Sequence, residues 1–370
     1  MERSTVVIDI DADSPEGTAL KEQFAVKALP SYVVLNAEGQ ELGRISAERT
    51  RAQFYGELAA ITARNSSLEA LRLEAASGGK RSVSATRMVL SAHLARGEGQ
   101  QGLDWFATLP AAVQADAIQR GDKLPRTLAR LQLKAAANTK QPEACLAAAE
   151  KALAGSLDCE SAYDLNAAMT CSAPEASDHR RGFLAAQAPR FETLLSRTVL
   201  GKPQGCADAR TAVFVLADLY KMQGNDAAKT AVFQKGIAYF EPKIAKSPKA
   251  DRNAADNLRV FYEAAAENSK LDALLERLVA AYPDDYVYAN RYARVLAARG
   301  AHEQALPWFA KASKKAYGIN RLKNAQARMQ SLLALKRGDE ARQVAAEALK
   351  ANGPWFPEET AKLKALLSAA

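Results

Sequence analysis

Residues 26–43 read VKALPSYVVLNAEGQELG, and this stretch decides how the first part of the chain folds. The β-branched and aromatic run SYVVLN is typical of a strand, and a second strand is expected over QELGRIS. Between them, NAEG supplies a turn in which Gly39 can adopt a positive φ. The pattern predicts a β-hairpin that begins directly after Pro30.

The segments on either side extend this hairpin to a small α/β module. Upstream, TVVIDID predicts a buried strand, and GTALKEQFAV has helical spacing. Downstream, ERTRAQFYGELAAITA places Phe54, Leu58 and Ile61 on one helical face. The predicted order is β-α-β-β-α. Because a helix crosses over between the first two strands, we expect that pair to be parallel and the third strand to be antiparallel.

From residue 65 onward we expect only helices, separated by short breakers such as SGGKRS, GKPQG and QGND. Two segments, residues 211–237 and 288–316, share a pattern in which a large apolar residue stands directly before an alanine, and a glycine follows seven positions after that alanine. Residues 331–349 are a degenerate copy of this pattern. This offset resembles the tetratricopeptide repeat, a helix pair with small residues at its contact. Generic alanine-rich helical hairpins are the alternative.

A second resemblance concerns about residues 4–62, which are similar to the second half of a thioredoxin-like domain. The features that carry it are the strand around Asp9 and Asp11, FAV leading into ALPSY, the strand VVL, the turn NAEG and the pair Gly43-Arg44. In that family the proline at the Pro30 position is cis and precedes a strand that pairs with extended substrate segments. The resemblance therefore implies substrate binding at Leu29, Pro30 and Ser31.

The chain departs from the thioredoxin pattern where the chemistry should lie. The family's nucleophilic cysteine belongs to a C-x-x-C motif at a helix N-terminus, whereas the first cysteine here is Cys145. The family's first two strands and the helix that carries this motif would precede Met1. We therefore expect no catalytic residue and no dithiol activity in these 370 residues.

Three interpretations remain open. The chain begins within a longer thiol-redox protein or redox chaperone, in which case an upstream C-x-x-C segment behind a signal peptide is expected. Alternatively, it is a complete, non-catalytic interaction scaffold whose degenerate thioredoxin-like part caps the helical repeats. The third interpretation is an unrelated small α/β cap on a helical array.

The four cysteines, Cys145, Cys159, Cys171 and Cys206, form no C-x-x-C pair. They are either buried small apolar side chains or structural disulfides, and disulfides imply an oxidising compartment. The three histidines have no metal-binding spacing. We therefore expect neither a metal nor another cofactor.

Composition and charge limit the classes of partner and the cellular locations that we expect for this protein. The net charge is +8, but Lys and Arg alternate with acids and form no basic stripe with aromatics, so we expect a protein or peptide partner and no nucleic acid. No run reaches the ~18 apolar residues of a membrane span. MERSTVVIDID lacks the regions of a signal peptide, which favours the cytoplasm, whereas the cysteines and the thioredoxin resemblance favour the periplasm or cell envelope. The oligomeric state is left open.

Residues 97–102, GEGQQG, match the dinucleotide-binding pattern G-x-G-x-x-G. Such a site requires a preceding strand, so that the backbone N–H groups face the pyrophosphate. The preceding SATRMVLSAHLAR is helical in pattern, and Glu98 would repel a phosphate. The segment therefore predicts a loop between two helices.

Together these patterns predict an α+β protein that is mostly α. We expect a partial thioredoxin-like β-α-β-β-α module over residues 1–64, a helical hairpin region over 65–205, and tetratricopeptide-like helical repeats over 206–370.

Overall fold

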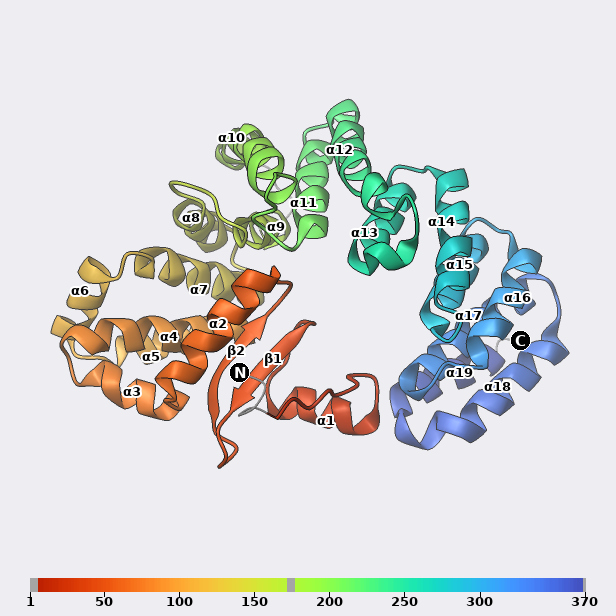
Figure 1. The fold of residues 1–370 in the computed structure, drawn as a ribbon, viewed down its shortest axis with the longest axis horizontal. Helices are drawn as coiled ribbons and strands as arrows, with labels where there is room; N and C mark the ends of the chain where they lie inside the picture. The colour runs from red at the N-terminus through yellow and green to blue at the C-terminus, as the bar shows by residue number, and fades with distance from the viewer. Residues whose placement is uncertain (1–5, 172–176, 369–370) are drawn as a thin grey trace. The chain divides into compact units, whose positions relative to one another are not determined.

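The computed structural model describes residues 6–171 and 177–368, with the Cys171 side chain outside the described set. As predicted, the chain is mostly α with a small β part, which in the described residues is one two-stranded sheet (Figure 1). Packing divides the chain into two compact units. We call residues 25–236 the central unit, and the residues before 25 together with those after 236 the terminal unit. This division falls inside a helix. The boundaries expected after residues 64 and 205 stay predictions.

The hairpin of the central unit forms where the sequence predicts it. Strand β1 (Ser31–Leu35) pairs antiparallel with β2 (Glu41–Ser46), and Tyr32 lies opposite Ile45. The turn between them uses Gly39 at a φ of 77°. Because a left-handed φ is easy only for glycine, this residue closes the hairpin at little cost.

Helix α2 (Arg51–Arg64) follows the hairpin and packs against β2. Thr50 and Gln53 form a reciprocal capping box that fixes where α2 begins. An added Cβ on Gly43 would lie 3.1 Å from Ile61, so glycine allows the close approach of strand and helix. Tyr32 on β1 contacts Phe54 on α2 edge-to-face, with ring centroids 4.7 Å apart.

The prediction of a strand within TVVIDID is wrong for residues 6–10, which the structure describes. Residues 6–10 adopt no regular structure, and Val6 is 86% exposed. A strand must pair its N–H and C=O groups with a neighbour, and the described residues contain no sheet other than β1–β2. The predicted parallel pair is therefore absent from the described structure, although the helix expected next forms as α1 (Pro15–Gln23).

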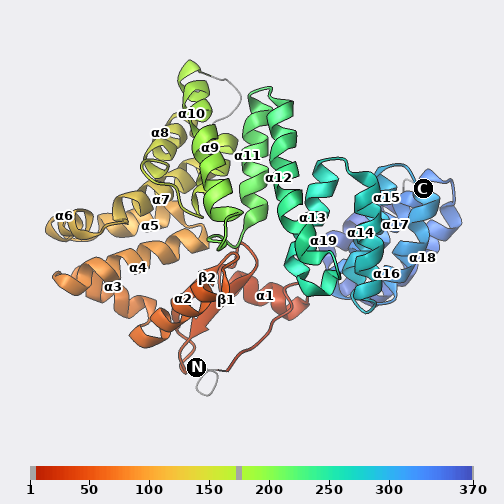
Figure 2. The ribbon, with the colours of Figure 1, turned by 45° about the horizontal axis from the view of Figure 1, so that its top comes forward.

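Nine further helices and one π-turn complete the central unit up to the start of α12. They are α3 (Leu68–Ala76), α4 (Lys80–Arg96), α5 (Gly99–Ala107), α6 (Ala111–Arg120), α7 (Leu124–Thr139), α8 (Pro142–Ala152), α9 (Ser161–Cys171), α10 (Asp178–Leu194), the π-turn at Leu195–Val199, and α11 (Ala209–Met222). Buried leucines and Phe106 join α3, α4, α5 and α7 into one core. Figure 2 shows α9, α10 and α11 side by side.

The G-x-G-x-x-G segment joins two helices, as predicted, although its last four residues already belong to the second helix. Gly97 ends α4 with a φ of 73°, and α5 begins at Gly99. An added Cβ on Gly99 would lie 2.6 Å from the backbone of α7, and one on Gly102 would lie 2.9 Å from the Cβ of His93. The glycines therefore allow close helix packing.

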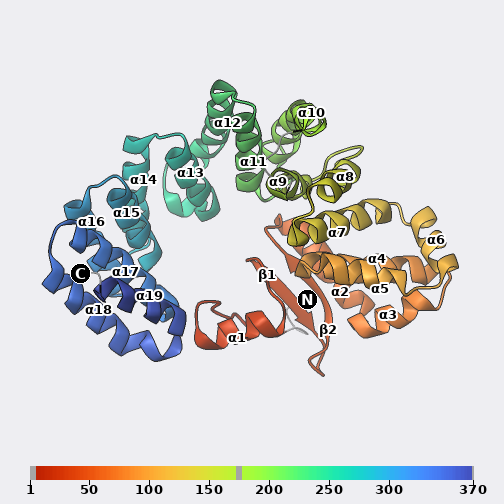
Figure 3. The ribbon, with the colours of Figure 1, turned by 180° about the vertical axis from the view of Figure 1, so that it is seen from behind.

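In the terminal unit, helical hairpins follow one another along the chain (Figure 3). The boundary between the units lies inside α12 (Asp226–Ile244), after which come a 3-10 turn (Pro248–Ala250), α13 (Arg252–Ala264), α14 (Asn268–Ala281), α15 (Tyr286–Ala298), α16 (His302–Ser313), α17 (Gly318–Ala334), α18 (Gly338–Asn352), a second 3-10 turn (Gly353–Trp355) and α19 (Pro357–Ser368). Within one hairpin, Tyr292 and Ala293 on α15 and Ala305 and Phe309 on α16 are all buried. The large-and-small alternation of the sequence thus lies at helix contacts.

The aspartates ahead of α1 attach to the start of α17. The Asp13 carbonyl accepts a hydrogen bond from the N–H of Ile319 at 3.4 Å, and its carboxylate accepts one from Asn320 at 2.6 Å. Asp11 accepts the N–H of Asp13 through its side chain. Asp11 therefore stabilises the turn before α1, and Asp13 attaches that turn to α17.

Candidate peptide-binding edge and its disulfide-linked support

One edge of the sheet is open in the described structure. The N–H of Ala47 donates to the Pro30 carbonyl at 3.0 Å, which makes Pro30 a hydrogen-bonded position of the antiparallel ladder. Such positions alternate along a strand, so Tyr32 and Val34 also face β2. Ser31 and Val33 then direct their N–H and C=O groups away from β2, and no described strand pairs with that side.

The three residues that the thioredoxin resemblance assigns to substrate binding lie where this edge begins. The Leu29–Pro30 peptide bond is cis, the isomer that the resemblance implies. Leu29 is 62% exposed, and the Ser31 hydroxyl donates to the Ala28 carbonyl at 2.7 Å. Tyr32 and Leu35 are exposed further along the strand. Within the described residues, the edge thus combines backbone groups that no strand pairs with and exposed apolar side chains.

A buried ion cluster holds the hairpin against the helices beneath it. Both carboxylate oxygens of Glu41 accept from Arg44, at 2.8 and 2.7 Å, and Arg96 of α4 donates to the same carboxylate at 2.6 Å. Burial alone would raise the pKa of Glu41, but hydrogen bonds from Arg44 and Arg96 outweigh it and lower that pKa. Glu41 is therefore a paired, ionised structural carboxylate.

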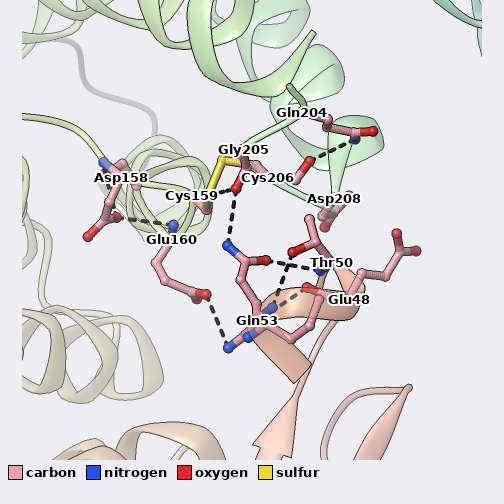
Figure 4. Close-up of a disulfide and its surroundings, with 12 residues drawn as sticks. Glu48, Thr50, Gln53, Asp158, Cys159, Glu160, Gln204, Gly205, Cys206 and Asp208 are labelled. Atoms are coloured by element: carbon pink, nitrogen blue, oxygen red, sulfur yellow. Dashed lines mark hydrogen bonds and ion pairs between the residues drawn. A yellow bond between two sulfur atoms is a disulfide. The ribbon is translucent and has the colours of Figure 1, made fainter. Parts of the chain in front are cut away.

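A disulfide joins Cys159 to Cys206 and so links the segment before α9 to the segment before α11 (Figure 4). Cys145 is disulfide-bonded as well, no described cysteine is free, and the Cys171 side chain lies outside the described residues. For the described cysteines, the structure therefore has disulfides where the sequence also allowed unpaired buried thiols. Cys206 is 2% exposed, whereas Cys159 is partly exposed.

The residues beside the two bonded cysteines contact the start of α2. Glu160, next to Cys159, forms an ion pair with Arg49 at 3.4 Å. Gly205, next to Cys206, accepts a hydrogen bond from the side-chain amide of Gln53 at 3.1 Å. Figure 4 shows these contacts around the disulfide. The bond therefore unites two separate segments into one support for α2, which we call the disulfide platform (residues 158–160 and 204–206).

Charged and hydroxyl groups reinforce this platform. Arg130 of α7 bonds Asp158 at 2.8 Å and Asp164 at 2.7 Å, and the Tyr163 hydroxyl donates to Asp208 at 2.5 Å. Burial raises the pKa of Asp164 to about 6 even though Arg130 opposes that shift. Burial and the bond to Asp208 likewise raise the pKa of Tyr163, so its hydroxyl remains a donor at neutral pH.

These groups hold the hairpin and α2 in place through polar and covalent contacts, and we assign none of them a chemical step. The described cysteines are oxidised, and Glu41 on β2 is paired with Arg44 and Arg96. Among residues 6–171 and 177–368, no three His, Cys, Asp or Glu side chains are grouped as metal ligands. No helix in the same part of the chain is long and apolar enough to cross a membrane.

Sequence reasoning missed the residues that support the edge. Gln53 and Gly205 are separated by 152 positions, and neither belongs to a motif. Arg49 and Glu160 are ordinary charged residues in the sequence. The even number of cysteines was the one sequence signal for a covalent link in this region, and it gave no pairing.

Comparison of the sequence with known proteins adds no assignment to this geometry. No protein-family model matches the chain, and none of the curated proteins compared with it matches significantly.

Proposed function

We propose that this protein binds an extended segment of a partner polypeptide along the open edge of β1, without dithiol chemistry of its own. The observation that carries the proposal is the outward direction of the backbone groups of Ser31 and Val33, immediately after cis-Pro30. A peptide strand added there would continue the sheet. The resemblance to thioredoxin-like proteins supports the same use of this edge.

Strand addition accounts for both features of the edge. Main-chain hydrogen bonds supply affinity for almost any extended segment, and alternate side chains supply selectivity. Leu29, Tyr32 and Leu35 offer apolar contact to the partner's side chains. The proposed ligand is therefore an extended polypeptide with apolar residues at alternate positions, such as an unfolded segment or a flexible tail.

The disulfides bear on where the protein works. Disulfides persist in oxidising compartments and are rare among reduced cytosolic proteins. The bonded state of Cys145, Cys159 and Cys206 thus supports a periplasmic or cell-envelope location over the cytoplasmic alternative. In that setting we propose a thiol-redox or redox-chaperone type of protein, of which these residues supply the binding part.

The second candidate is an interaction scaffold whose partners bind only the helical hairpins. Its supporting observation is the succession of similar hairpins from α13 to α18, since arrays of this kind commonly present binding surfaces. The two functions differ in whether the β1 edge contributes to binding.

Fluorescence anisotropy with a labelled peptide of alternating valine and threonine tests the proposal. Val33→Pro removes an outward N–H while leaving the inferred ladder bonds to β2 in place. We expect at least about tenfold weaker binding, because a backbone acceptor of the peptide loses its partner. Val7→Pro, in the exposed segment at residues 6–10, is the matched control and should bind normally.

A modified peptide gives a second measurement that leaves the protein unchanged. N-methylation at alternate residues removes the N–H groups on one edge of the peptide. Methylation in one of the two alternating registers should abolish binding, and methylation in the other should have little effect. Equal binding of both methylated peptides, together with wild-type affinity for Val33→Pro, would overturn the proposal in favour of the helical scaffold.

A further inference from the structure

We infer that the Cys159–Cys206 disulfide is a redox-sensitive support for the peptide-binding edge, and that its reduction by a dithiol weakens peptide binding. This inference rests on the proposed function for its effect on binding. Its structural half, the coupling of the disulfide to β1, stands on the contacts alone. The sulfur atoms connect to Pro30 and Tyr32 through two consecutive layers of contacts.

The first layer runs from the disulfide to the start of α2. Glu160 holds Arg49, and Gly205 holds Gln53, through one polar contact each. Each contact alone is weak, because partly exposed ion pairs and single hydrogen bonds contribute little. With the sulfur atoms bonded, both contacts belong to one rigid platform.

The second layer runs from α2 to the edge. Arg49 lies two residues after Ala47, whose N–H donates to the Pro30 carbonyl at 3.0 Å. One helical turn after Thr50, Phe54 packs against Tyr32 with the ring centroids 4.7 Å apart. A shift of the first turn of α2 therefore moves both the residue that fixes Pro30 and the ring that supports β1.

The exposure of the two cysteines decides which sulfur atom a reductant attacks. Cys159 is partly exposed and Cys206 is buried, so a thiolate of the reductant attacks the Cys159 sulfur. The S–S bond breaks, its electron pair goes to Cys206, and that sulfur takes up a proton. The second thiol of the reductant then attacks the mixed disulfide and releases Cys159 as a thiolate, leaving the reductant oxidised.

Other bonds limit the consequence of reduction. Tyr163 still donates to Asp208, and Arg130 still holds Asp158 and Asp164. The segments before α9 and α11 therefore stay near each other without forming one support. Reduction should loosen α2 locally and leave the helical packing intact, which is the behaviour of a switch rather than of a folding requirement.

Hydrogen–deuterium exchange on the full chain tests the coupling. The variant Cys145→Ser/Cys171→Ser leaves Cys159 and Cys206 as the only cysteines, and is compared before and after treatment with dithiothreitol. Uptake should rise in peptides covering residues 47–54 and 29–34 and stay constant in α15 and α16. Unchanged uptake at residues 47–54 overturns the inference.

Peptide affinity measured on the same two samples separates the inference from the proposed function. We expect binding at least about fivefold weaker after reduction, with recovery on reoxidation, and no redox response in Cys159→Ser/Cys206→Ser. In the oxidised state, Gln53→Ala should show part of the loss without any change at sulfur. Equal affinity in both redox states, with binding still lost in Val33→Pro, overturns the inference alone. Absence of binding in every sample overturns the proposed function, and the exchange data then decide the coupling.

Discussion

The disulfide platform consists of two loop segments, whereas the terminal unit consists of helical hairpins, and the two regions are held together differently. In the hairpin of α15 and α16, partners such as Tyr292 and Trp308 are close in sequence and pack at 4.9 Å. In the platform, Cys159 and Cys206 are 47 positions apart, and Gln53 reaches Gly205 across 152. Periodic apolar packing holds the helical hairpins together, whereas long-range polar and covalent links hold the disulfide platform together.

This difference indicates which region is suited to regulation. Removing a buried ring from a periodic hairpin leaves a cavity and lowers stability without creating an alternative state. A disulfide, by contrast, has two chemical states, and the contacts beside it respond to both. The platform connects to the open edge through the start of α2, so we expect a local change in the platform to affect binding.

The largest effect is expected from the terminal hairpins. Phe309 is fully buried, so Phe309→Ala should lower the free energy of unfolding by about 3–5 kcal/mol. Urea denaturation followed by circular dichroism measures the loss. The exposed Trp355 supplies the control, because Trp355→Ala removes a larger ring from a solvent-facing position. Similar losses in the two variants would contradict the assignment of Phe309 to a packed core.

The next effect concerns the covalent link. Cys159→Ser/Cys206→Ser should destabilise the central unit by about 2–4 kcal/mol, since the bond restricts the unfolded chain. Trp105 reports on this unit when Trp308 and Trp355 are replaced by phenylalanine. Urea unfolding monitored by its emission gives the difference. Cys159→Ser alone should lower the free energy of unfolding by the same amount, because either change removes the same bond.

The smallest effect is a pH dependence from Asp164. Burial raises its folded pKa from 3.8 to about 6, so the folded state binds the proton more tightly than the unfolded state. The stability contributed by Asp164 is therefore highest below about pH 4 and falls as the pH rises to about 6, by at most about 3 kcal/mol. Urea unfolding of the wild type and of Asp164→Asn across this pH range measures the stability that Asp164 contributes. A contribution that increases with pH would contradict this prediction.

The sequence predicted the parts of the fold that depend on local pattern. Turn chemistry, periodicity and flanking residues predict the strands at Ser31–Leu35 and Glu41–Ser46, helix α2 and the junction between two helices at residues 97–102. The general class, mostly helical with a small β part, follows in the same way.

The wrong and missing predictions concern features that depend on contacts between residues far apart in the sequence. TVVIDID has the composition of a strand, but residues 6–10 have no neighbouring strand in the described structure. β-propensity alone cannot satisfy backbone groups. Arg49, Gln53, Glu160 and Gly205 meet only through the tertiary fold, so the support of the candidate edge could not be predicted from spacing.

Residue-resolved amide exchange with and without bound peptide shows whether the β1 edge is the binding site. On addition of the alternating valine–threonine peptide, we expect new protection at the Val33 amide and little change at Tyr32 and Val34, whose amides already face β2. Protection confined to the helices of the terminal unit, with Val33 unchanged, would contradict it.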